Sequence, residues 1–156
     1  IDVSAHQGEI DWQAVKNDGI DFAMIRLAYR GYGQSGNLLV DANYETNIDG
    51  ALAAGLDVGV YVFSQAVTEE EAVEEANLAI ENLQGRDITY PVVFDMEEIA
   101  GDEARTYGLA EYDKWLAQYY RTPAFPYSFQ MWQYTNTGSV AGITGDVDMN
   151  LCFTPW

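Results

Sequence analysis

Strand-like runs alternate with helical stretches along most of this chain, and that alternation limits the possible folds more than any other feature. Several runs are almost continuously apolar or aromatic, as expected for strands that are buried on both faces of a sheet. A regular succession of strands and helices is typical of a parallel α/β architecture. The seven strand candidates are residues 1–4, 22–28, 58–63, 91–96, 115–119, 129–134 and 147–151.

Three helices are predicted from signals at their ends. Asp11 can cap a short helix that runs to residue 17, and a second helical stretch covers residues 43–54. Thr68 and Glu71 form a capping box that opens a longer helix, which ends at Gly85. No fixed-period repeat, low-complexity segment or interdomain linker interrupts the pattern, so residues 1–156 are expected to form a single domain.

The strand count is one short of a closed eight-stranded (β/α) barrel, a fold that usually needs about 250 residues. The deficit has a location, because only residues 98–114 separate Glu97 from Trp115 and no strand pattern occurs there. The sequence therefore predicts an α/β fold of the irregular, TIM-like (β/α) barrel type. In this barrel a helix–strand–helix passage is expected to be absent between about residues 98 and 114.

The densest polar feature follows the fourth strand candidate, where an apolar run leads into Asp95-Met96-Glu97. Side chains at i and i+2 share a face of a strand, so Asp95 and Glu97 point together. At the carboxyl end of a barrel strand they would lie at the mouth, where active sites form. Neighbouring like charges raise the pKa of one member, which leaves a proton for general-acid chemistry. Taken alone, such a pair is more often a polar strand end than a catalytic site.

Two further acids change that interpretation. Asp2 lies on the first strand candidate and Asp148 on the last, and these strands are neighbours in a closed barrel. Bringing four acidic side chains together at one barrel mouth costs free energy, which a purely structural role does not explain. They suit either carboxylate-assisted glycoside hydrolysis or a hard divalent cation.

Aromatic residues on nearby strand candidates support a carbohydrate cleft, since sugar rings pack their C–H faces on aromatic rings. Packing in the core accounts equally well for part of this set, which comprises Tyr61, Phe63, Trp115, Tyr119, Trp132 and Tyr134. Arg26, in an otherwise apolar strand, needs a carboxylate partner or faces the mouth, and we favour the mouth. His6 is as compatible with hydrogen bonding in a loop as with a functional contact.

The charge balance argues against several classes of function. The chain has 25 acidic and 7 basic residues, a formal net charge of −18. Such a surface repels phosphate backbones and anionic membranes, so we expect no nucleic-acid or membrane partner. A single cysteine, Cys152, provides neither a disulfide framework nor a cysteine-type metal site. The first residues lack the pattern of an export signal, which we expect to have been removed or to lie outside this sequence.

Motifs along nearly the whole chain resemble the glycoside hydrolase family 25 lysozymes, and they occur in family order. They are residues 2–8, 10–12 and 15–16, residues 22–26, Asn47 with Gly50-Ala51 and Gly55, and residues 58–61, 91–97, 115–119, 132–134 and 145–150. The departure is the stretch after Glu97, where family members carry another helix, strand and helix. This agrees with the deficit inferred from the strand count.

The resemblance implies an irregular (β/α) barrel that cleaves the β-1,4 bond between N-acetylmuramic acid and N-acetylglucosamine in peptidoglycan. It implies that Glu97 is the general acid and base, with Asp95, Asp2 and Asp148 as the other catalytic acids. The expected substrate-binding residues are Arg26, Tyr61, Phe63, Tyr119 and Trp132. We expect no metal or cofactor, a monomer, and an extracellular or cell-wall-associated location. A catalytically inactive wall-binding domain and a metal-dependent hydrolase are the alternatives.

Overall fold

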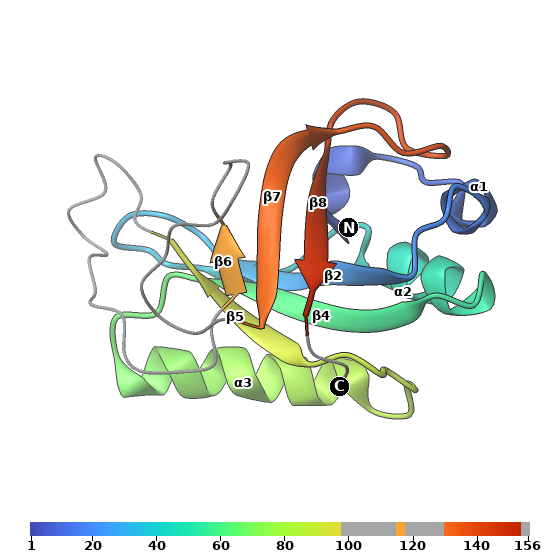
Figure 1. Cartoon of the computed structure of the whole chain (residues 1–156). Coiled ribbons are helices and arrows are strands. Elements are labelled where there is room, and N and C mark those ends of the chain that lie inside the picture. The colour runs from blue at the N-terminus through green and yellow to red at the C-terminus, as the bar shows by residue number, and fades with distance from the viewer. Residues whose placement is uncertain (98–114, 118–129, 154–156) are drawn as a thin grey trace.

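The computed structural model describes residues 1–97, 115–117 and 130–153, which form a mixed α/β fold with a sheet that curls into a half barrel (Figure 1). Its strands are β1 (Asp2–Val3), β2 (Phe22–Arg30), β3 (Leu38–Val40), β4 (Asp57–Ser64), β5 (Val92–Met96), β6 (Trp115–Ala117), β7 (Met131–Gly138) and β8 (Val147–Cys152). Its helices are the 3-10 helix η1 (Ala5–Gln7) and the α-helices α1 (Trp12–Asn17), α2 (Tyr44–Ala53) and α3 (Glu69–Leu83). Each predicted strand and helix overlaps an observed one, whereas β3 was not predicted.

The strand order in the sheet is β5-β4-β2-β1-β8-β7-β6, with β3 beside β2. Strands β1, β2, β4 and β5 run parallel to one another. Strand β8 is antiparallel to both β1 and β7, and β3 is antiparallel to β2. The prediction of a parallel sheet was therefore wrong for β8, and the unpredicted strand β3 is antiparallel as well. The physical reason is the length of their connections, since residues 31–37 and 139–146 are too few for the crossover that a parallel pair needs.

The described residues do not close the barrel, because β5 pairs only with β4 and β6 pairs only with β7 among them. These two strands form the two edges of the curled sheet. The predicted absence of a passage near residues 98–114 concerns a segment outside the described residues.

Two apolar layers hold the sheet. The outer layer packs the sheet against α2 and α3 and includes Ile25, Val60 and Val62, which are fully buried. The inner layer fills the concave side of the curl with Phe22, Met24, Tyr61 and Met131. Because side chains alternate along a strand, this inner layer identifies which positions of β2 and β4 point into the half barrel.

Helix ends follow the predicted capping. The Asp11 carboxylate accepts from the Ala14 N–H at 3.0 Å, and the Thr68 hydroxyl accepts from the Glu71 N–H at 3.2 Å. These bonds satisfy donors that have no partner inside the helix. No helix within the described part of the chain is both long enough and apolar enough to cross a membrane.

A buried charge network joins α3 to the ends of β2 and β4. Arg30 is 3% exposed, and its Nε donates to Glu75 Oε1 at 2.7 Å. Its other nitrogens donate to the Gly36 carbonyl at 2.8 Å and to Glu74 Oε2 at 3.0 Å. The second oxygen of Glu75 accepts from the Ser64 hydroxyl at 2.6 Å. The network therefore fixes the carboxyl end of β4, beside which β5 ends.

Candidate active site

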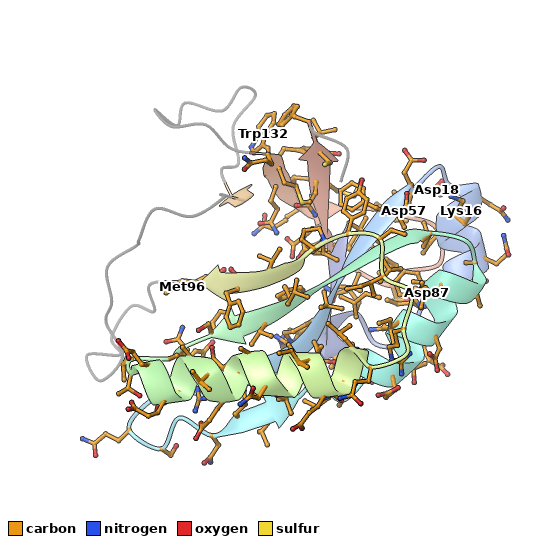
Figure 2. The ribbon with its side chains drawn as sticks, turned by 90° about the horizontal axis from the view of Figure 1, so that it is seen from below. Lys16, Asp18, Asp57, Asp87, Met96 and Trp132 are labelled. Atoms are coloured by element: carbon orange, nitrogen blue, oxygen red, sulfur yellow. The ribbon has the colours of Figure 1, made fainter. Side chains whose placement is uncertain are left out.

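Asp95 and Glu97 lie at the carboxyl end of β5, as predicted. Asp95 is the Cα partner of Phe63 on β4, and it is half-buried. Glu97 follows the last residue of the strand and is exposed. Figure 2 shows this end of β5 at Met96, far along the sheet from Asp57 at the start of β4. The pair thus combines a shielded carboxyl group with one that is open to a ligand.

Asp2 and Asp148 face each other across the β1–β8 pair, where they are direct Cα partners. Asp2 is 5% exposed, and its Oδ2 accepts from Gln133 Nε2 at 2.8 Å and from Asn150 Nδ2 at 2.7 Å. Asp148 forms a side-chain hydrogen bond with Asp2. The predicted approach of the first and last strands is therefore confirmed, although the two strands run antiparallel.

The electrostatics tie the four acids into one cluster. Burial, and after it the charges of Glu97, Asp2 and Asp148, together raise the pKa of Asp95 to about 7. Burial, together with the charge and hydrogen bond of Asp2, also raises the pKa of Asp148 to about 7. Desolvation and like charges both disfavour the ionised form of a carboxyl group. Near neutral pH the cluster therefore holds protons that isolated aspartates would have lost.

Arg26 has a carboxylate partner and also acts on the acids of the cluster. Its Nε and one terminal nitrogen lie 2.8 Å and 2.7 Å from Asp41 Oδ2. The Asp41 side chain is fully buried and also accepts from the N–H groups of Ala5 and Asn43. The charge of Arg26 lowers the pKa of Asp95, opposing the other effects. The two alternatives for Arg26 are thus compatible.

Tyr61 and Phe63 line the concave side of β4. Tyr61 is 9% exposed, and burial, followed by the charge of Asp2, raises its pKa well above the usual range. Its hydroxyl therefore remains protonated and can donate a hydrogen bond near the acids. Phe63, beside Asp95, meets the ring of Tyr32 edge to face with centroids 6.1 Å apart.

Trp132, one of the two remaining predicted contacts, is not brought to the cluster. Trp132 is 8% exposed and follows Met131 of the inner layer, so strand alternation places it on the opposite face of β7 from Gln133. Figure 2 shows Trp132 on β7, apart from Met96 at the end of β5. Tyr119 lies outside the described residues. Substrate contacts by Trp132 and Tyr119 stay predictions.

Four residues at the site were not predicted as site residues: Asp41, Gln65, Gln133 and Asn150. Gln65 is fully buried, and its Nε2 donates to the Glu97 carbonyl at 3.3 Å. One signal for Asn150 was present in the sequence, because it lies two residues after Asp148 and so shares its strand face. His6 is exposed, and its N–H donates to the Ser4 hydroxyl at 3.2 Å.

A separate cavity of about 540 Å³ lies near the start of α2, lined by residues that include Glu9, Asp11 and Asn47. None of the four acids lines it, so it is distinct from the acid cluster.

No group of three His, Cys, Asp or Glu side chains is placed to hold a metal ion within the described ranges. What the cluster can do chemically is donate and accept protons at a neutral polar substrate.

Comparison with known proteins identifies the family. Residues 1–108, more than half of the chain, match the model of the glycosyl hydrolases family 25. The chain belongs to this family. Among curated relatives of this family 25 chain, the autolytic lysozyme of Clostridium acetobutylicum is 24% identical over 184 residues, which cover 96% of the chain and 54% of the relative. Lysozyme M1 of Streptomyces globisporus is 27% identical over 201 residues, which cover 96% of the chain and 66% of the relative.

Solved structures of similar fold agree with this placement. The bacterial lysozyme of Streptomyces coelicolor superposes with a TM-score of 0.74 at 25% identity, covering 99% of the family 25 chain and 91% of its own. The modular autolysin LytC of Streptococcus pneumoniae gives a TM-score of 0.78 at 23% identity, covering 96% and 45%. The mixed α/β fold with a curled sheet is thus shared with these proteins.

The lengths of the aligned regions agree with the expectation that this chain is shorter than other family members. They extend over 184 and 201 residues, although this family 25 chain has only 156. The relatives therefore carry additional residues within the aligned region. The chain spans between about half and two thirds of the length of these two curated relatives.

Proposed function

We propose that this family 25 chain is a peptidoglycan hydrolase of the lysozyme type. It would cleave the β-1,4 bond between N-acetylmuramic acid and N-acetylglucosamine. The observation that carries this proposal is the convergence of Asp2 and Asp148, on the central strands β1 and β8, with Asp95 and the exposed Glu97 at the end of β5. The relatives named as lysozymes and as an autolysin supply the substrate class.

In the proposed mechanism the Glu97 carboxyl group donates its proton to the glycosidic oxygen as the bond from that oxygen to the anomeric carbon breaks. The 2-acetamido carbonyl oxygen of the muramic acid attacks the anomeric carbon and forms a cyclic intermediate. Asp95 orients the acetamido group and stabilises the positive charge. Water then opens the ring at the anomeric carbon and returns a proton to Glu97. We favour this substrate-assisted route over direct attack by a second carboxylate.

Asp2 and Asp148 would set the protonation of the pair. A pKa of about 7 for Asp95 means that its charge changes near neutral pH. Asp2 is held by two side-chain amides, and its charge contributes to the raised pKa of both Asp95 and Asp148. Arg26, Tyr61 and Phe63 are proposed to contact the sugar, together with Tyr119 and Trp132.

The finer structural and cellular assignments belong to the same proposal. We infer that the half barrel is part of an irregular (β/α) barrel and that residues 1–156 act as one monomeric catalytic domain. The substrate is a wall polymer, so the site of action would be the cell wall or the extracellular space. The proposed chemistry needs no metal ion or cofactor, because carboxyl groups supply both the acid and the charge stabilisation.

The test is a Glu97→Gln variant assayed for reducing ends released from purified peptidoglycan. The variant should bind the wall and lose nearly all turnover, whereas Glu69→Gln, at the exposed start of α3, should behave as the wild type. Robust turnover by Glu97→Gln would remove Glu97 from the acid's role. Mass spectrometry should find muramic acid at the new reducing ends, and glucosamine there would contradict the proposed bond. Binding without any release by the wild type would favour the alternative, an inactive wall-binding domain.

A further inference from the structure

The loop between β2 and β3 presents an aromatic ring that the mechanism above does not use. Tyr32 is 58% exposed, a large fraction for an aromatic side chain. Its ring lies edge to face with Phe63, at 6.1 Å between centroids and 86° between planes. Phe63 is in turn the β4 partner of Asp95. Tyr32 is therefore separated from Asp95 by the ring of Phe63.

The loop that carries Tyr32 is anchored by hydrogen bonds of residues before and after it in the chain. The Gly31 N–H donates to the Asn37 carbonyl at 2.9 Å, which closes the base of the loop. Buried Arg30 donates to the Gly36 carbonyl at 2.8 Å and is itself held by Glu75. A ring on an anchored backbone loses less conformational entropy on binding than one on a free loop. The exposed position of Tyr32 is thus fixed before any ligand arrives.

We propose that Tyr32, supported by Phe63, forms a binding site for a pyranose ring of the glycan strand, beyond the two sugars that flank the cleaved bond. The inference rests on the proposed function and adds a subsite to it. The apolar C–H face of the sugar would pack on the exposed face of the Tyr32 ring, while Phe63 supports the edge of that ring. The contact is uncharged, so it avoids the repulsion between a chain of net charge −18 and the carboxylates of the wall.

This geometry separates binding from chemistry. In the proposal Tyr32 contacts a sugar that does not flank the cleaved bond, so its contact is the same in the ground state and in the transition state. Removal of such a uniform contact raises KM and leaves kcat in place. Aromatic contacts of this kind correspond to roughly a 2- to 12-fold change in affinity.

The experiment uses peptide-free glycan strands, sorted by length, as the probe. Tyr32→Ala should raise KM roughly 2- to 12-fold on long strands, and the effect should shrink on the shortest strands that are cleaved. Tyr32→Phe keeps the ring and should recover most of the lost affinity. Phe153→Ala is the matched control, since Phe153 is 56% exposed but follows β8 at the opposite end of the sheet.

Three results would overturn the subsite: an equal KM for Tyr32→Ala and the wild type on long strands, a loss of kcat at every length, or a Tyr32→Phe variant as weak as Tyr32→Ala. In a parallel series on peptide-bearing strands, an effect of Tyr32→Ala that is absent on peptide-free strands would assign the contact to the stem peptide and would also overturn the subsite. Dissociation constants measured in a Glu97→Gln background test the subsite without turnover. A failure of the proposed function, in which no variant releases reducing ends, is thereby distinguished from a failure of the subsite.

Discussion

Replacing Glu75 with alanine should lower the free energy of unfolding by about 3 kcal/mol. Glu75 is fully buried and accepts from both Arg30 and the Ser64 hydroxyl. Removing one member of a buried ion pair costs about 3–5 kcal/mol, because the other charge loses its partner without regaining water. The lower end applies here, since Arg30 retains Glu74 at 3.0 Å and the carbonyls of Gly36 and Glu71.

The assay is equilibrium unfolding in urea, supported by thermal melting. For a domain of this size a loss of about 3 kcal/mol lowers Tm by roughly 6–12 °C. Glu74→Ala is the matched control, because Glu74 contacts the same guanidinium but its side chain is 62% exposed. Exposed ion pairs contribute about 0–1 kcal/mol, so this control should unfold almost as the wild type does.

The comparison between the two variants carries the test. If Glu74→Ala and Glu75→Ala lose the same stability, burial does not set the value of the Arg30 contacts and the reasoning is refuted. A loss below about 1 kcal/mol in Glu75→Ala would mean that water or the remaining acceptors replace the carboxylate. A far-ultraviolet circular dichroism spectrum like that of the wild type would show that the variant still folds.

Four further predictions follow from the site and its supports. Gln65→Ala should lower kcat on the order of 10-fold with little change in KM, because the Gln65 amide holds the Glu97 carbonyl at 3.3 Å; a rise in KM alone would contradict this. The pKa of about 7 for Asp95 lies above its value of 3.8 in an unfolded chain, so the native state binds the extra proton and this group's contribution to stability falls as pH rises from about 4 to about 7. Asp95→Asn should therefore be more stable than the wild type at pH 8, and an equal or lower Tm there would refute that sign. Gly50→Ala should cost about 1–3 kcal/mol in urea unfolding, because its Cβ would lie 2.3 Å from Cδ1 of Trp12. Chelation with EDTA should leave turnover intact, and loss of activity that added Mg²⁺ or Ca²⁺ restores would favour a metal-dependent hydrolase.

The sequence predicted those features that depend on local spacing. Capping by Asp11 and Thr68 follows from the positions of a side-chain acceptor and the first backbone donors, so the helix starts were accessible. The common face of Asp148 and Asn150 follows from the two-residue repeat of a strand. The approach of Asp2 to Asp148 needed one further assumption, that the first and last strands are neighbours, and the register confirms it.

Features that depend on pairing between distant residues were not accessible in the same way. Asp41 follows β3, a strand of three residues that is too short to show a period. Its contact with Arg26 exists because the loop after β2 folds back antiparallel. The direction of β8 was missed for a related reason, since the alternation of its apolar and polar residues is the same in either direction. Such contacts follow from register, which one sequence does not specify.

The unpredicted contacts explain how the four acids tolerate one another. The guanidinium of Arg26 is already bonded to Asp41, so much of its charge is balanced away from the cluster. Asp2 is instead stabilised by the amides of Gln133 and Asn150. Asp95 and Asp148 respond by holding protons to about pH 7. Because Asp95 and Asp148 hold protons near neutral pH, the cluster has less negative charge there than four ionised carboxylates would, and this lowers the cost of placing the four groups together.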